Sequence, residues 1–167
     1  MRTFSPKRLL RTLDEHRVEL VVIGMGAAVL QGAPAQTFDI DVVHARTAEN
    51  VQRILSWLRE CNGRYRGDPR RLAPTAEHLL GPGHQLLETD HGPIDFMGMV
   101  GPAGGLLDYP ALLGRSVLAD LGGFTARLLE LEAIVELKRA TGRPKDLAAL
   151  PLLEATLRER RRIPREE

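Results

Sequence analysis

The sequence is poor in the residues that build disulfide frameworks, base-stacking surfaces and membrane spans. Cys61 is the single cysteine among 167 residues, which excludes a disulfide framework and a zinc site made of several cysteines. Aromatic residues make up 4% of the chain, which argues against a base-stacking sheet. The apolar stretches are far shorter than the roughly 20 residues of a membrane span, and the N-terminal residues lack the apolar core of a signal peptide. We therefore expect a cytoplasmic protein with no membrane partner.

Neither sign of charge is in excess. Lys and Arg together number 23 and Asp and Glu 22, so the net charge is +1 and any nucleic-acid contact must come from a local patch. Hydrophobic residues account for 43% of the chain, which is enough for one core without disulfides or a structural metal. We expect a single domain over 1–167, with its core in 20–100 and C-terminal helices in 128–162.

Local patterns predict helices and strands that alternate along the chain. Ser5 followed by Pro6 is typical of a helix start, and β-branched runs and alternation of polar and apolar residues indicate strands. The expected elements are a helix to about His16, strands at 20–23 and 37–43 around a short helix at 24–32, a helix from 47 to about 61, paired strands at 84–89 and 94–100, a helical turn at 110–115, a helix at 128–141, and a last helix from 144 with a frayed tail at 158–162.

Two aspartates one residue apart, Asp39 and Asp41, are the sharpest local signal. On a strand their side chains point to the same face, roughly 6.5 Å apart. Two carboxylates at that distance repel each other unless a cation lies between them. Mg²⁺ is bound by one or two carboxylates together with substrate phosphates, so a metal site is one interpretation. The other is that both acids face solvent, the commoner outcome for an isolated pair.

Two further segments support the metal interpretation. Gly24-Met25-Gly26 follows a predicted strand and opens a helix, where backbone N–H groups bind anions and glycine permits close approach; a simple tight turn is the alternative. Asp95 lies between Ile94 and Phe96 on an apolar strand, where a charge needs a partner or a site. A third carboxylate beside the first two would complete a two-metal cluster.

The C-terminal half offers candidate cations. Lys138 falls on the helix face of the apolar residues at 131, 134 and 135, as either a structural lysine or a cation that reaches a phosphate, with Lys145 as second candidate. Asp146 lies in the first turn of the last helix, where it complements the helix dipole or faces a site. The arginines of residues 64–71 either receive RNA or form a solvated loop.

Together these residues resemble the DNA polymerase β-type nucleotidyltransferase superfamily over about residues 20–150. Its glycine turn and Asp-apolar-Asp pair are matched by Ile23-Gly24-Met25 and Asp39-Ile40-Asp41, and Gly92–Phe96 looks like its third acidic strand. Residues 138–146, Lys-Arg-Ala-Thr-Gly-Arg-Pro-Lys-Asp, look like a segment of AbiEii-like toxins and minimal nucleotidyltransferases. Met25 replaces the usual Gly or Ser, and Ala35 stands where many relatives have Arg.

The resemblance implies an α/β (α+β) nucleotidyltransferase fold, with a mixed β-sheet, helices packed mainly on one face, and a C-terminal helical segment. It implies an enzyme that uses Mg²⁺ or Mn²⁺ to transfer a nucleoside monophosphate from an NTP, such as ATP, to an acceptor hydroxyl. Asp39, Asp41 and Asp95 would be the metal-binding and catalytic residues. The nucleotide-binding residues would be Gly24, Met25, Gly26, Thr37, Lys138 and Lys145.

The acceptor would be RNA, such as a tRNA end, or a protein, and a toxin-like enzyme would have an antitoxin partner. Two alternatives stay open: a catalytically weakened member that acts as a binding or regulatory module, and a small-molecule (antibiotic) nucleotidyltransferase.

Overall fold

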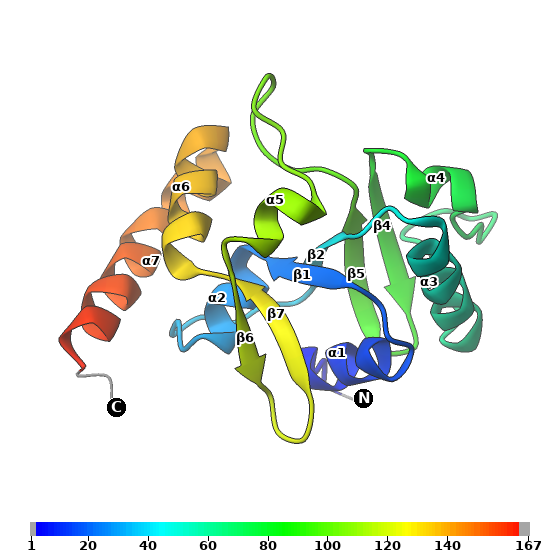
Figure 1. Cartoon of the computed structure of the whole chain (residues 1–167), viewed down its shortest axis with the longest axis horizontal. Helices are drawn as coiled ribbons and strands as arrows, with labels where there is room; N and C mark the ends of the chain where they lie inside the picture. The colour runs from blue at the N-terminus through cyan, green and yellow to red at the C-terminus, as the bar shows by residue number, and fades with distance from the viewer. Residues whose placement is uncertain (1–2, 164–167) are drawn as a thin grey trace.

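The computed structural model describes residues 3–163 and has a seven-stranded mixed sheet flanked by helices (Figure 1). The strand order across the sheet is β3-β4-β5-β2-β1-β7-β6. In chain order the elements are α1 (Pro6–Glu15), β1 (Leu20–Ile23), α2 (Gly24–Leu30), β2 (Ile40–His44), α3 (Ala48–Glu60), β3 (Arg64–Tyr65), α4 (Ala76–Leu80), β4 (His84–Thr89), β5 (Gly92–Met97), α5 (Tyr109–Leu113), β6 (Ser116–Asp120), β7 (Thr125–Leu129), α6 (Leu131–Thr141) and α7 (Pro144–Arg162).

The helix starts follow the expected capping chemistry. The side chain of Ser5 accepts a hydrogen bond from the backbone N–H of Arg8, and Pro6 opens α1, which buries three leucines. Thr47 caps α3 in the same way, and α3 ends at Glu60, as the sequence predicted. Trp57 of α3 is buried edge-on against Phe96 of β5, so α3 lies over that face of the sheet.

The sheet register places two of the acidic residues side by side. β2 is antiparallel to β1 and parallel to β5, and Asp41 pairs with Ile23 on one side and with Asp95 on the other. Directly paired residues of neighbouring strands project from the same face, so Asp41 and Asp95 share a face. Ile40, Ile94 and Phe96 project from the opposite face into the core.

Helices cover both faces of the sheet at its centre, where the sequence predicted helices mainly on one face. All four residues of β1 are buried. Because neighbouring side chains of a strand point to opposite faces, both faces of β1 must be covered. The fold class itself, a mixed sheet with flanking helices and a C-terminal helical segment, is confirmed.

The hairpin of β6 and β7 was not predicted, and it corrects the start of the following helix. Leu128, expected to begin a helix, lies in β7 and pairs with Val22. Glu130 is the N-cap of α6, which begins at Leu131. Leu128 and Leu129 end a buried strand and Leu131 begins a helix, and short apolar stretches do not distinguish a buried strand from a buried helix.

Four smaller expectations were also wrong. β2 begins at Ile40 rather than at residue 37, so Asp39 lies just before the strand. The short strand β3 and the helix α4 lie in a stretch expected to be irregular. β5 runs from Gly92 to Met97, whereas the expected strand was 94–100; it therefore begins inside the expected turn and ends three residues early. α7 continues to Arg162 where a frayed tail was expected, and Arg161 and Arg162 form ion pairs with Glu132 and Glu159.

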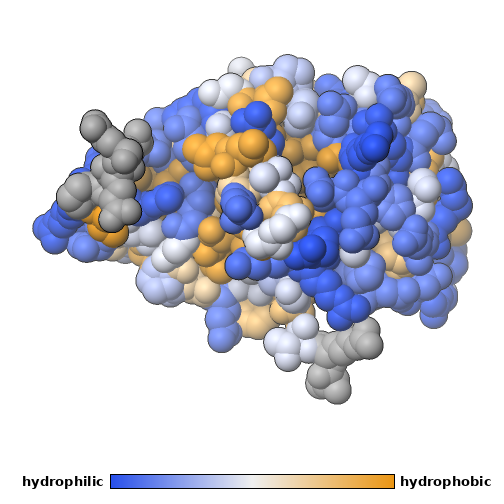
Figure 2. All heavy atoms as spheres, turned by 60° about the horizontal axis from the view of Figure 1, so that its bottom comes forward, coloured by the Kyte–Doolittle hydropathy of each residue, from blue (hydrophilic) through white to orange (hydrophobic). Residues whose placement is uncertain are grey.

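On the face seen in Figure 2, hydrophobic patches lie among hydrophilic residues. Part of the exposed apolar surface of the molecule belongs to the edge strand β6, whose residue Leu118 is 58% exposed. Within residues 3–163, none of the helices combines the length and the apolar character that a membrane span requires.

Candidate active site

Three carboxylates meet where β2 and β5 run side by side. Asp39 precedes β2, Asp41 lies within it and Asp95 lies in β5, and one oxygen from each lies within 4.8 Å of the others. Asp95 is buried, whereas Asp39 and Asp41 are half-buried and reach a cavity or solvent. The structure thus brings together the three acids that the sequence singled out. Thr37 supports them, because its hydroxyl donates to the carbonyl oxygen of Asp39 at 2.7 Å.

The electrostatics of this acid cluster, meaning Asp39, Asp41 and Asp95, favour a bound cation. Burial, together with the charges of Asp39 and Asp95, raises the pKa of Asp41 to about 7, and the charge of Lys138 opposes this rise. Burial also raises the pKa of Asp95, against the opposing charge of Arg66. Three oxygen donors at this spacing suit a hard divalent cation such as Mg²⁺ or Mn²⁺, which would remove the repulsion.

Glycine is required at the junction of β1 and α2. Gly24 has φ of +64°, and a Cβ there would lie 3.0 Å from Oδ2 of Asp41. Gly26 is buried, and a Cβ there would lie 2.8 Å from Cδ1 of Ile40. Both glycines therefore let α2 approach β2 closely. Met25, which stands between them, packs its side chain against the hydrophobic core.

A cavity of about 330 Å³ opens beside the acid cluster. Asp41 and Gly24 border it from the sheet, and Lys138 and Arg143 border it from α6 and the loop that follows. Its other lining residues are Ile23, His84, Met97, Val100, Gly101, Pro102, Ile134, Leu137, Thr141 and Asp146. Acidic and basic groups from distant parts of the chain thus face one space.

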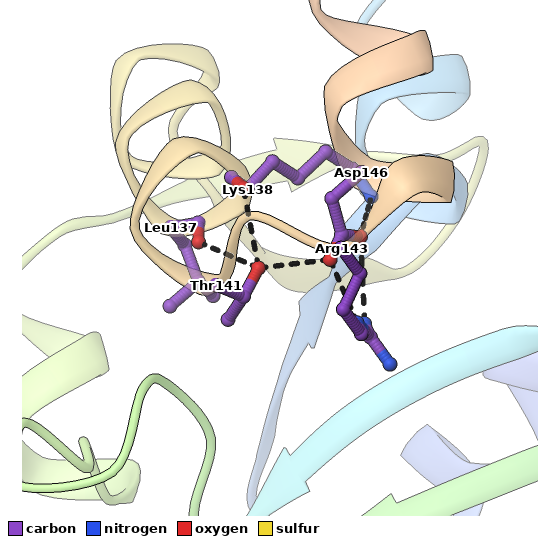
Figure 3. Close-up of polar contacts among 5 residues, drawn as sticks. All are labelled: Leu137, Lys138, Thr141, Arg143 and Asp146. Atoms are coloured by element: carbon purple, nitrogen blue, oxygen red, sulfur yellow. Dashed lines mark hydrogen bonds and ion pairs between the residues drawn. The ribbon is translucent and has the colours of Figure 1, made fainter.

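Asp146 organises the basic side of the cavity (Figure 3). Its carboxylate is 3% exposed and accepts from the Arg143 Nε at 2.7 Å, the Thr141 hydroxyl at 2.9 Å and the Lys138 Nζ at 3.4 Å. Burial alone would raise the pKa of Asp146, but the hydrogen bonds from Arg143 and Thr141 and the charge of Lys138 hold it below its usual range. Gly142, at φ of +64°, ends α6 and turns the chain toward α7.

Both interpretations of Lys138 have support in this geometry. Its ammonium group pairs with Asp146, and the same side chain borders the cavity and acts on the charge of Asp41. Lys145, the second candidate, is exposed in the first turn of α7 and is absent from the cavity lining within residues 3–163. Arg143, two residues before Lys145, borders the cavity.

Arg66 is a member of the site that the sequence did not identify. Its Nη2 donates to Oδ1 of Asp95 at 2.9 Å and to the carbonyl oxygen of Leu87 at 3.0 Å. The available signal was that Asp95, inside an apolar strand, needs a partner; spacing along the chain could not name that partner.

The arginines of 64–71 therefore do not form one cluster. Arg66 binds Asp95, and Arg70 pairs with Asp68 at 3.1 Å. Arg64 and Arg71 line a second cavity of about 370 Å³, together with Arg59 of α3.

No known family model and no curated protein matches this sequence. Among solved structures, the chain is similar to a protein of Thermotoga maritima described as a "putative nucleotidyltransferase". The two share 22% sequence identity over 95% of this chain and 97% of the other, with a TM-score of 0.55. The likeness concerns architecture: the chain adopts a nucleotidyltransferase-type fold.

Proposed function

We propose that this protein is a metal-dependent nucleotidyltransferase, which transfers a nucleoside monophosphate from an NTP to an acceptor hydroxyl and releases pyrophosphate. The observation that carries the proposal is the cavity with Asp41 of the acid cluster on one wall and Lys138 and Arg143 on another. Phosphoryl transfer depends on positioning and on compensation of phosphate charge, and these two walls would supply both.

The acid cluster would hold the metal. Asp39, Asp41 and Asp95 offer oxygen donors alone, the set that Mg²⁺ and Mn²⁺ prefer. A bound divalent cation would neutralise charge on the phosphate and on the attacking and leaving oxygens. Burial raises the pKa of Asp95, so its carboxylate is suited to accept the proton of the acceptor hydroxyl.

The basic wall would bind the phosphates. Lys138 and Arg143 would compensate the charge that develops on the leaving pyrophosphate, and the fixed network around Asp146 would keep both in place. Gly24 borders the same cavity and would admit a phosphate close to the backbone. Gly26 and Met25 would support the nucleotide site by packing. Thr37 would support it through the hydrogen bond that fixes the backbone at Asp39.

Transfer of label from each of the four α-labelled NTPs tests the activity, with Mg²⁺ and total tRNA present. We expect label to appear on RNA with the wild-type protein and to be absent with Asp41→Asn, which removes one metal ligand. Asp14→Asn, on the exposed surface of α1, is the matched control and should keep wild-type turnover. Wild-type turnover by Asp41→Asn would overturn the metal assignment, and label on the protein itself would point to protein modification.

Ligand binding can be measured without turnover. Mg²⁺ alone should stabilise the protein weakly and Mg²⁺ with an NTP strongly, because Mg²⁺ gains ligands from phosphates. Linkage predicts about 2.7 kcal/mol of added stability at a hundredfold excess over Kd. A thermal-shift series should show it, and no shift with any NTP would favour a module that has lost nucleotide binding.

For the acceptor, we propose RNA bound at the second cavity. Arg59, Arg64 and Arg71 border that cavity, and the lining within residues 3–163 contains no carboxylate side chain. Arginines that line a cavity without carboxylates beside them are suited to bind the phosphates of an RNA backbone.

The salt dependence of RNA binding tests this. For a single-stranded RNA oligonucleotide, the slope of log K against log salt should fall in magnitude by about 0.7 for each phosphate that the double variant Arg59→Gln and Arg71→Gln no longer neutralises. Arg70→Gln, whose arginine is paired with Asp68, is the control. An unchanged slope in the double variant would show that RNA does not use this cavity.

A further inference from the structure

The guanidinium group of Arg66 lies against one member of the acid cluster, Asp95. One nitrogen, Nη2, donates both to Asp95 and to the carbonyl oxygen of Leu87, which uses both of its hydrogens. One positive charge therefore already lies against a carboxylate that the proposed function assigns to a divalent cation.

The backbone around Arg66 holds it firmly in this position. Its N–H donates to the carbonyl oxygen of Leu86 at 2.9 Å, and the N–H of Tyr65 donates to that of Leu72 at 2.8 Å, which closes the loop. Within the loop, the Asp68 carboxylate accepts from the backbone of Arg70 at 3.0 Å. The side chain of Arg66 is nevertheless 36% exposed, so it has a path to solvent.

The negative charge of the acid cluster exceeds the positive charge that Arg66 supplies, so a divalent cation can compete with Arg66 for Asp95. Of the three carboxylates, Asp95 pairs directly with Arg66, while Lys138 and Arg143 are bound to Asp146. A divalent cation that binds Asp95 must either displace Arg66 or lie next to its positive charge. Either requirement lowers the affinity of the site for the cation.

We propose that Arg66 is a resident counter-ion of the acid cluster that competes with divalent metal at Asp95, so that the protein binds bare metal weakly. A metal that arrives with a nucleotide gains phosphate ligands and overcomes the competition. The inference rests on the proposed function in that it takes the acid cluster as the metal site. It assigns to Arg66 the regulation of that site.

The experiment measures Mn²⁺ affinity of the nucleotide-free protein by electron paramagnetic resonance. Arg66→Gln and Arg66→Met remove the charge, and both should bind Mn²⁺ about threefold to tenfold more tightly than the wild type. Arg66→Lys keeps the charge and should stay close to wild-type affinity. Arg70→Gln, in the same loop but outside the acid cluster, is the control and should not change it. Circular dichroism and urea midpoints confirm that each variant is folded.

The outcomes separate this inference from the proposed function. Affinity that is unchanged or weaker in both neutral variants overturns the competition, while Mn²⁺ binding that is lost in Asp41→Asn still supports the metal site. If neither the wild type nor the Arg66 variants bind Mn²⁺, with or without an NTP, the metal site and the competition at it both fail. A purely structural role for Arg66 would lower the urea midpoint without tightening Mn²⁺ binding.

Discussion

Two aspartates on opposite sides of one cavity have opposite electrostatics. Burial acts to raise the pKa of both: it is the largest cause of the pKa of about 7 at Asp41, whereas the pKa of Asp146 is lowered although its side chain is 3% exposed. Asp146 accepts from Arg143, Thr141 and Lys138. Asp41 has two carboxylates as near neighbours, which raise its pKa, and the charge of Lys138 acts to lower it.

The difference teaches that partners, and not burial alone, decide whether a carboxylate stays charged. Asp146 is already saturated with donors, which suits a structural anchor for the basic wall. The charge of Lys138 lowers the pKa of Asp41 by less than burial and the two acidic neighbours raise it, and a carboxylate in this condition at a cavity is a candidate for ligand binding. The following substitutions test each half of this contrast.

The largest effect on stability is expected at Asp146. Asp146→Ala removes the acceptor of three donors and leaves the half-buried Lys138 without a partner, so we expect about 3–5 kcal/mol loss in the free energy of unfolding. Glu154→Ala, which breaks the exposed pair with Arg139, is the control and should cost less than about 1 kcal/mol. Urea denaturation measures both, and equal losses would contradict the anchor role.

Removal of the Lys138 charge should affect turnover more than stability. In Lys138→Met, Asp146 keeps Arg143 and Thr141, so the stability loss should be about 1 kcal/mol or less. The activation barrier should rise by roughly 2–4 kcal/mol, the range for one lost electrostatic partner. A large loss of stability that Asp146→Leu restores would instead assign Lys138 to structure.

The smallest effect is a pH dependence of the metal-free protein. The pKa of Asp41 is about 7 in the folded state and 3.8 ordinarily, so its protonation stabilises the folded state at low pH. That contribution declines as the pH rises from about 4 and is lost above about 7. Asp41→Asn, measured in EDTA, should therefore gain stability relative to the wild type between pH 5 and pH 8.

The comparison with the variant removes the contribution of groups that titrate outside the acid cluster. Burial lowers the pKa of His44, which reduces stability as the pH falls below 6.5, but it does so in both proteins alike. A stability difference that stays constant between pH 5 and pH 8 would contradict the raised pKa of Asp41.

Much of the acidic half of the site was predictable from sequence. Asp39 and Asp41 are close in the chain, and the strand that carries Asp41 could be read from its alternation. Asp95 stood out because a charge in an apolar strand requires compensation. The glycine at position 24 marked the end of β1, where its positive φ is required.

The basic half was less predictable. The periodicity of α6 placed Lys138 on the core-facing side, but it could not choose between Asp146 and a ligand. Arg143 and Arg66 lie in segments without periodicity, so no pattern indicated where their side chains point. The end of β7 was missed because Leu128 and Leu129 matched the apolar pattern of the helix that follows.

The sequence by itself determined the caps, the buried strands and the acidic pair, since these depend on residues within one or two turns or one strand. The tertiary structure decided which charges meet. The sheet register places Asp95 beside Asp41, and Arg66, the residue after β3, forms a hydrogen bond with Asp95. Such contacts join residues far apart in the chain, and they arise only when the core fixes the register of the strands and the packing of the helices.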